Sequence, residues 1–259
     1  MGVLCKNKKK GILAMDKRTL MLFMGIKIAV IGLCVSFFGV RYVIGQIWFD
    51  KTADNRDVIY ELHKSDNKPL IDSYDASGKT GLMLAASYGN FELVQEFVKV
   101  GANVRLHAQD DSEDTALHIA CYNGDFTQGT AIIEFLLNAG ADPSSRNKRG
   151  ETPLHHCMQI DNLDARRAIM TLMVKRGADI NGQDRNGTTV LHLAVNNKED
   201  YGVEMLLSTF GPTIDFSLTN NKGKTALEYA RFLGFTDVAR RIEQYLSTLQ
   251  RTKPGTDSD

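Results

Sequence analysis

Histidine and cysteine are the residues of this chain whose chemistry could hold a metal ion or catalyse a reaction. The sequence contains six His and four Cys, and they are adjacent only at His155-His156-Cys157. Zinc is commonly bound by these side chains. Neighbouring residues on a helix point about 100° apart, however, and no second pair with ligand spacing accompanies this cluster. The pattern therefore predicts no metal site.

Three of the histidines occupy a recurring position, which favours a structural role over a catalytic one. The sequence also lacks a Gly-rich phosphate loop, a Gly-x-Ser-x-Gly nucleophile motif and a His-Glu-x-x-His motif. We therefore expect no catalytic residue, no cofactor and no enzymatic activity. Each of the three histidines follows a threonine by three residues, in the pairs Thr115/His118, Thr152/His155 and Thr189/His192.

The segments that position these residues are copies of one another. Threonines recur every 35–37 residues, at positions 80, 115, 152, 189 and 225. A Leu follows two residues later in every copy, and a small residue stands at the fifth position after the threonine. A second signal, Gly-Ala followed by Asn or Asp, begins at Gly101, Gly140 and Gly177. Several correlated positions that recur in this way indicate a repeat architecture.

These residues resemble the ankyrin repeat, a unit of about 33 residues with Thr-Pro-Leu-His-x-Ala near its start. The resemblance covers about residues 75–248 and implies an all-α solenoid of about five helix-turn-helix repeats with finger loops. Each threonine is expected to cap the first helix of its repeat, and each closing glycine to adopt the left-handed conformation. The resemblance also implies that the three histidines hydrogen-bond between successive fingers.

Two copies depart from the pattern in length. The threonine and the closing glycine are 21 residues apart in the first copy and 25 apart in the second and third. The difference is close to one helical turn, so the extra residues, around 126–130 and 160–165, are expected to lengthen a helix. The finger at 107–114 is also longer, and Glu113 replaces the glycine of its turn.

Cys121 and Cys157 are expected in the first helices of neighbouring repeats. Packed helices lie typically about 8–10 Å apart, which exceeds the usual Cα separation of a disulfide. A buried free Cys behaves as a small apolar residue. We therefore expect free thiols at these positions, although an oxidising compartment leaves a disulfide open.

The N-terminal region has a different composition. Residues 1–49 contain eight Lys or Arg and one Asp, so the other 210 residues carry a net charge of −7. Residues 28–40 have no charged side chain, and the apolar stretch extends back to Leu20 with Lys27 as its single interruption. About 20 apolar residues cross a bilayer. Residues 20–43 therefore predict a transmembrane helix or signal anchor, preceded by a basic tail at 1–19.

Alternatives stay open for this segment. It could be a cleaved secretory signal, for which Val43-Ile44-Gly45 is a passable cleavage site, and the lack of a polar face disfavours a buried core helix. Basic residues concentrate before Thr19, which places the N-terminus in the cytoplasm and the repeats on the trans side, periplasmic or extracellular. The chain starts at Met1 or at Met15.

The remaining segments complete the predicted domain organisation. Residues 44–74 are assigned to a juxtamembrane segment and an N-terminal cap helix, because the ends of a solenoid need polar caps. Asp237–Tyr245 suits a C-terminal cap, and the polar residues 249–259 are expected to be disordered. The mildly acidic repeat region argues against nucleic acid as a partner, since phosphate contacts need a basic surface.

Partner binding is what the resemblance implies, through the finger tips and the exposed side of the first helices. Tyr, Trp and Arg carry most binding energy in interfaces. Whether the aromatic residues at these positions are exposed or pack on neighbouring repeats stays open. The candidate partner-binding residues are Tyr88, Tyr122, Arg149, Arg185, Lys148, Asp111, Asn123, Asn196 and Phe232.

The sequence thus predicts a single-pass, membrane-anchored ankyrin-repeat module or scaffold that binds an unidentified protein. Two alternatives are a secreted ankyrin-repeat effector, released after signal cleavage, and a regulatory subunit of an enzyme complex. Acidic residues dominate the second finger and basic residues the third to fifth, so we expect a partner of matching polarity.

Overall fold

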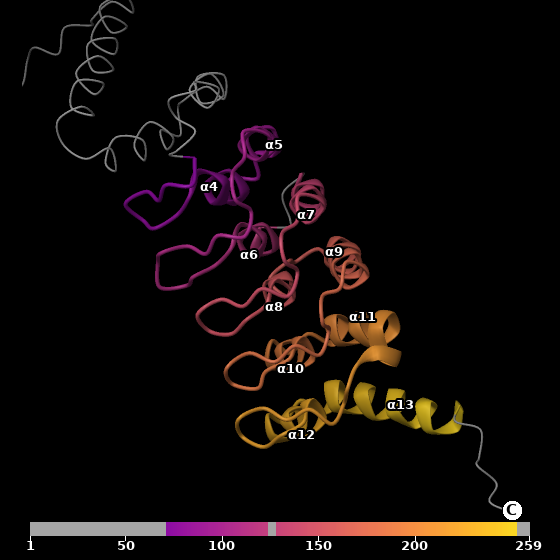
Figure 1. Cartoon of the computed structure of the whole chain (residues 1–259). Helices are drawn as coiled ribbons and strands as arrows, with labels where there is room; N and C mark the ends of the chain where they lie inside the picture. The colour runs from indigo at the N-terminus through magenta and orange to yellow at the C-terminus, as the bar shows by residue number, and fades with distance from the viewer. Residues whose placement is uncertain (1–70, 124–127, 253–259) are drawn as a thin grey trace, which may run out of the picture.

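A computed structural model describes residues 71–123 and 128–252 of the chain. In this part the chain folds into pairs of antiparallel helices that stack side by side in one row (Figure 1). Regular strands are absent from the described residues, where β structure is limited to isolated bridges. The helices are α4 (Gly81–Ser87), α5 (Phe91–Lys99), α6 (Ala116–Tyr122), α7 (Gly129–Asn138), α8 (Pro153–Cys157), α9 (Leu163–Lys175), α10 (Val190–Asn196), α11 (Asp200–Phe210), η2 (Gly211–Thr213), α12 (Ala226–Phe232) and α13 (Thr236–Thr252).

The row consists of two layers of helices and a series of loops, one before each first helix. The first helices of the repeats, α4, α6, α8, α10 and α12, form one layer, and the second helices, α5, α7, α9, α11 and α13, form the other (Figure 1). Before each first helix the chain makes a hairpin-like loop, here called a finger, which projects away from the second-helix layer. The all-α solenoid predicted from the repeat is therefore confirmed.

Each first helix begins at the threonine of the repeat, as predicted. The side-chain oxygens of Thr80, Thr115 and Thr189 each accept the backbone N–H three residues later, at 3.4 Å. This contact satisfies one of the backbone donors that a helix start leaves without a partner. Pro153 follows Thr152, where the missing N–H costs nothing.

Neighbouring fingers are joined by one main-chain hydrogen bond per step. The backbone N–H of Lys148 donates to the carbonyl of Ser112 at 2.9 Å, and that of Arg185 donates to Arg149 at 3.0 Å. Because the donor and acceptor belong to successive repeats, these bonds fix the spacing of the finger tips. The same bond joins Gln109 to Gly78 and Asn221 to Asn186, each at 2.7 Å.

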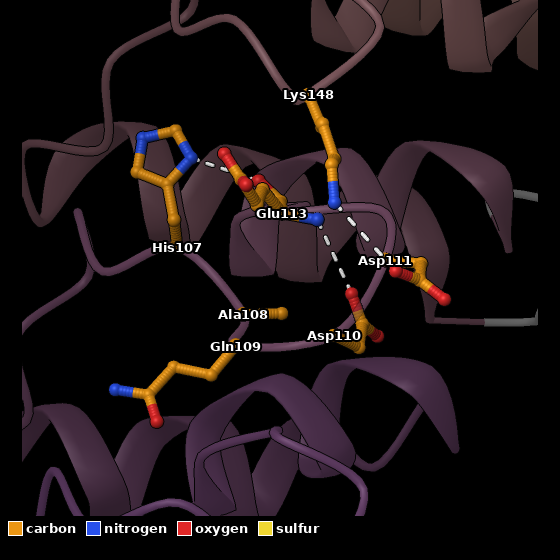
Figure 2. Close-up of a pocket in the computed structure, with 7 residues that line it drawn as sticks. All are labelled: His107, Ala108, Gln109, Asp110, Asp111, Glu113 and Lys148. Carbon is orange, nitrogen blue, oxygen red and sulfur yellow. Dashed lines mark hydrogen bonds and ion pairs between the residues drawn. The ribbon is translucent and has the colours of Figure 1, made fainter.

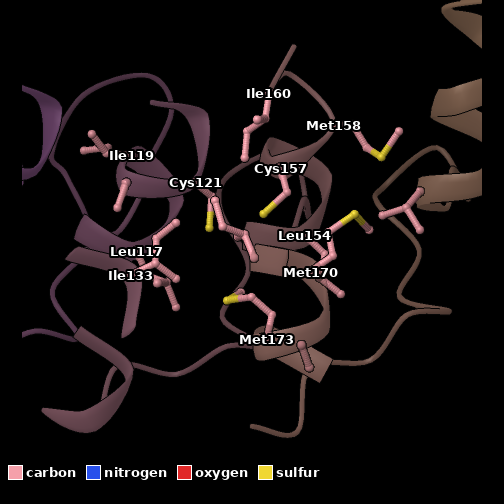
Figure 3. Close-up of a cluster of buried hydrophobic side chains, with 14 of the residues drawn as sticks. Leu117, Ile119, Cys121, Ile133, Leu154, Cys157, Met158, Ile160, Met170 and Met173 are labelled. Carbon is pink, nitrogen blue, oxygen red and sulfur yellow. The ribbon is translucent and has the colours of Figure 1, made fainter. Parts of the chain in front are cut away.

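The core lies between the two helix layers and continues from repeat to repeat. Small residues at the fifth position after the threonine, such as Ala120 and Ala194, are fully covered by the next repeat. Cys157 takes this position in the third repeat, and its thiol packs beside that of Cys121 among Leu and Met side chains (Figure 3). Both cysteines are free thiols, and burial, followed by the Cys157 contact, raises the pKa of Cys121.

The departures from the repeat pattern have clear structural outcomes. The extra residues of the third repeat lengthen its second helix, since α9 has 13 residues where α5 has 9. Glu113 adopts the left-handed backbone conformation, with φ 56°, that the finger glycines adopt elsewhere. The three closing glycines also have positive φ, as predicted.

The C-terminal boundary needs a correction. Helix α13 continues to Thr252, so residues 249–252 are helical and the expectation of a disordered tail from 249 is wrong for them. Tyr245, at the end of the C-terminal cap that the sequence suggested, and Leu246, directly after it, still pack on the core, which favours continuation of the helix.

The predicted membrane segment at 20–43 lies outside the described residues, as do the basic tail and residues 44–70. Among the helices at 71–123 and 128–252, none combines the length and the apolar character that a bilayer crossing requires. The anchor therefore stays a prediction.

Candidate partner-binding surface

The recurring histidines form hydrogen bonds from one repeat to the next, which we call ties. The Nε2 atom of His118 lies 3.0 Å from the carbonyl oxygen of Glu151, on the next finger. His155 contacts the carbonyl of Thr188 at 2.9 Å, and His192 contacts that of Lys224 at 3.1 Å. The predicted hydrogen bond between successive fingers is thus confirmed for all three histidines.

The other ring nitrogen of each histidine faces its own helix cap. The backbone N–H of Thr152 donates to Nδ1 of His155 at 3.1 Å. Since Nδ1 accepts there, the ring proton belongs on Nε2, where it is donated to the next finger. Burial favours this neutral form: it lowers the pKa of His155 and His192, and lowers that of His118 to about 4. These residues therefore hold structure and have no free group for catalysis.

A polar network lies under the second and third fingers. His156 is buried between two carboxylates, with Nε2 at 3.3 Å from Oε2 of Glu151 and 3.6 Å from Oδ1 of Asp114. Asn147 donates to both carboxylates, at 3.0 and 2.8 Å. The hydrogen bond from His156 is the main reason why the pKa of Glu151 lies well below its usual range, with Asn147 and Arg149 adding to the effect against the opposing effect of burial.

This network was not foreseen from the sequence. The His-His-Cys cluster suggested metal chemistry at most, whereas His156 instead joins two fingers. Among the described residues, no group of three His, Cys, Asp or Glu side chains is arranged to hold a metal ion. The available signal was the acidic residue directly before the cap threonine, which occurs at Asp114 and again at Glu151.

The aromatic candidates are exposed on the first-helix layer. Tyr88, Tyr122 and Phe232 expose 53%, 59% and 61% of their surface. Each stands at or just after the C-terminal end of a first helix, so packing against a neighbouring repeat does not cover them. The ring of Tyr122 lies edge-on to His156, with 6.4 Å between ring centroids, which connects this exposed ring to the buried network.

The charged candidates divide into two groups. Arg149 is paired with Glu151, through Nε at 2.9 Å and Nη2 at 2.8 Å, and Lys148 lies 3.6 Å from Asp111. These side chains already have partners within the array. Arg185, by contrast, is exposed and forms no ion pair within the described ranges.

The two asparagine candidates stabilise the stack of first helices. The side-chain amide of Asn123 donates to the carbonyl of Ser87 at 3.3 Å. The side-chain oxygen of Asn196 accepts from the hydroxyl of Tyr229 at 3.1 Å. Asn196 is nevertheless exposed, whereas Asn123 is half-buried, so Asn196 is the better placed of the two for a partner.

The long second finger borders a shallow hollow of about 650 Å³, whose lining includes the carboxylates of Asp110, Asp111 and Glu113 (Figure 2). Asp110 is drawn inward by hydrogen bonds from Ser112, at 2.9 Å to the backbone N–H and 2.7 Å to the hydroxyl. Asp111 points outward and contacts Lys148 at the rim. The hollow is therefore built by local turn contacts and by an ion pair to the third finger.

Comparison with known proteins agrees with this architecture. A family model described as ankyrin repeats (3 copies) matches residues 51–147, 127–215 and 167–245. The match begins at residue 51, inside the segment that the sequence assigned to the juxtamembrane region and cap. The boundary at residue 75 stays a prediction.

Individual relatives match over parts of their length. The chain is 33% identical over 95 residues to the E3 ubiquitin-protein ligase KEG of Arabidopsis thaliana, covering 37% of this chain and 6% of that protein. It is 29% identical over 120 residues to the ankyrin repeat-containing protein YGL242C of Saccharomyces cerevisiae, covering 44% and 62%. It is 36% identical over 86 residues to protein phosphatase 1 regulatory subunit 27 of Mus musculus, covering 33% of this chain and 52% of that protein. The chain thus spans less than two thirds of each of these relatives.

Proposed function

Because this chain belongs to the ankyrin repeat family, we propose that it is a protein-protein interaction module or scaffold that binds its partner through the finger tips and first helices. The observation that carries the proposal is the exposure of Tyr88 and Tyr122 on consecutive first helices. Large aromatic rings exposed side by side are costly in water and are typical of interfaces. His156, which contacts the ring of Tyr122, is itself held between Glu151 and Asp114.

Photo-cross-linking in the native host tests this proposal. A photoreactive phenylalanine analogue at Tyr122 is expected to give one dominant protein adduct in intact cells, identified by mass spectrometry. The matched control is the same analogue at Tyr201, which is 71% exposed but lies on α11 in the second-helix layer. Equal adducts at both positions, or none at Tyr122, would contradict binding through the first helices.

We further propose that residues 20–43 anchor the module in a membrane, with the array on the trans side. The support is the apolar stretch of the sequence and the excess of basic residues before it. Protease treatment of intact and permeabilised cells, with an epitope after Thr252, tests the topology. An epitope that stays protected both in intact cells and in cells whose outer membrane alone has been opened would overturn it, and a mature N-terminus near residue 45 would favour the secreted alternative.

A regulatory subunit of an enzyme complex is the second candidate. The likeness to protein phosphatase 1 regulatory subunit 27 of mouse favours it, since that relative is named for such a role. The adduct formed at Tyr122 distinguishes the candidates, because a regulatory subunit would cross-link to an enzyme and co-purify with it in fixed stoichiometry.

A further inference from the structure

The cations of the fourth and fifth fingers differ from those of the third finger in whether they form ion pairs. In the third finger, Lys148 and Arg149 are both paired with carboxylates at 3.6 and 2.8 Å. In the next two fingers Arg185, Lys222 and Lys224 form no ion pair with any residue at 71–123 or 128–252. We call these three side chains the basic finger tips.

The carboxylates nearest in sequence to the basic finger tips are used locally. Asp184 accepts the backbone N–H groups of Asn186 and Thr188, at 2.8 and 2.7 Å, and so closes its own finger turn. Glu228 accepts the backbone N–H of Thr225 at 2.9 Å, which holds its pKa below the usual value. Neither carboxylate forms an ion pair with the basic finger tips, and only a weaker attraction links Glu228 to Lys224.

The basic finger tips have a fixed relation to one another. The backbone N–H of Asn221 donates to the carbonyl of Asn186 at 2.7 Å, and Gln183 donates to the carbonyl of Thr219 at 2.9 Å. These two bonds tie the fourth finger to the fifth, next to α10 and α12 (Figure 1). The cations therefore stand on two fingers that hydrogen bonds hold together, with Arg185 and Lys222 exposed and Lys224 half-buried.

An exposed apolar ring lies beside these cations. The ammonium of Lys224 is 4.9 Å from the ring centroid of Phe232, which is 61% exposed, and that of Lys222 is 5.8 Å from the ring of Tyr229. Contact with a ring holds each lysine stem over the first helix α12 without neutralising its charge. The surface thus combines unpaired positive charge with apolar area.

We propose that the basic finger tips and Phe232 bind an acidic segment of a partner protein that also carries an apolar side chain. The inference rests on the proposed function and names the chemistry of the partner at one end of the array. Carboxylates of the segment would pair with the basic finger tips, which form no ion pair among the described residues, and its apolar side chain would cover Phe232. The acidic second finger would repel such a segment, so binding is confined to the C-terminal half.

A nucleic acid fits this surface less well. Nucleic-acid binding depends on many phosphate contacts spread along a basic surface. Here the positive edge spans two fingers, and the residues outside the N-terminal 49 carry a net charge of −7. A short acidic stretch in a protein matches an edge of this extent.

Peptide binding to the full chain tests the inference. The probes are fluorescent peptides of about twelve residues, in which Phe is interspersed with Glu, with Lys or with Ser. We expect the Glu peptide to bind most tightly. The variant R185E/K222E/K224E should weaken it about tenfold, as expected for three modest exposed charge pairs. Raising the salt concentration should reduce the affinity of the unmodified chain and leave the variant nearly unaffected.

The matched control is R167E/K175E/R240E, which makes the same change in net charge on the exposed surface of α9 and α13. It should change the affinity for the Glu peptide by less than about twofold. An equal loss in both variants, no preference for the Glu peptide, or tighter binding of a single-stranded oligonucleotide would overturn the inference. If the Tyr122 cross-link persists in R185E/K222E/K224E while the peptide test fails, the proposed function stands and only the acidic partner is refuted.

Discussion

The third residue after the cap threonine differs between the middle repeats and the end repeats, and so do its contacts. In the second, third and fourth repeats this position is a histidine that reaches the next finger, as His118 reaches Glu151. In the first repeat it is Met83, whose sulfur accepts only the backbone N–H of Thr80, at 3.4 Å. In the fifth repeat it is Glu228, which closes the same local cap. The hydrogen bond that caps a helix thus forms within one repeat, whereas the hydrogen bond to the next finger requires a neighbouring repeat.

This difference shows where side-chain hydrogen bonds join successive repeats. Among the described residues, the side-chain hydrogen bonds of Met83 and Glu228 stay within their own helix cap. The histidines do both, because an imidazole has two nitrogens on opposite sides of the ring. The middle of the array is therefore held by side-chain ties as well as by apolar packing, and single substitutions test this difference.

The largest effect is expected from the buried tie between the third and fourth repeats. Arg166, whose side chain is 4% exposed, pairs with Glu199 and donates from Nε to the carbonyl of Ile160 at 2.7 Å. Arg166→Met should lower the free energy of unfolding by about 3–4 kcal/mol, since it leaves the carbonyl of the buried Ile160 without this donor and the half-buried Glu199 without its cation. Urea denaturation followed by circular dichroism measures this loss. The double variant R166M/E199Q should lose less, and an equal or greater loss would contradict the explanation.

Replacing a middle histidine by the residue of the first repeat tests the comparison directly. His118→Met should cost about 2 kcal/mol, because the carbonyl of Glu151 loses its donor and the cap of Thr115 is weakened. The change is close in volume, so a packing defect contributes little. The matched control is Met83→Leu, which alters an untied position and should cost less than about 1 kcal/mol. Similar losses at both positions would show that the tie is unimportant.

The middle repeats should also be the source of pH dependence. Burial lowers the pKa of His118 from 6.5 to about 4, and lowers those of His155 and His192. The unfolded chain therefore binds more protons than the folded one between about pH 6.5 and 4, and stability is lost as the pH falls through this window. From pH 7.5 to 5 the His118 contribution is about 1–2 kcal/mol. Urea midpoints at the two pH values measure it, and His118→Met should reduce the difference.

The smallest expected effect is an increase in the free energy of unfolding. Met83→His would place the middle-repeat residue in the first repeat, where its Nε2 would face the carbonyl of Asp114, the residue before Thr115. A new tie should raise the free energy of unfolding by about 1 kcal/mol. The measurement is the urea midpoint above pH 7, where the added imidazole is neutral. A loss of stability would mean that the first finger pair is spaced differently from the others.

Local features of this fold were predictable because they depend on residues close together in the sequence. The cap threonines, the closing glycines and the turn at Glu113 follow from backbone preferences over a few positions. The lengthened α9 followed from helix geometry, and the exposed aromatic residues stand at positions that the repeat itself defines. The polar network around His156 was missed, because its members meet only when two fingers stack.

The repeat, the start of each first helix and the residues that face the next copy follow from the amino-acid sequence alone. Which charged side chains are paired between repeats depends on the tertiary structure. Lys148 pairs with Asp111 of the preceding finger, whereas Arg185 of the next finger forms no ion pair at 71–123 or 128–252. The physical reason is that an ion pair depends on side-chain atoms within about 4 Å. Stacking of whole repeats sets that distance, and sequence spacing does not.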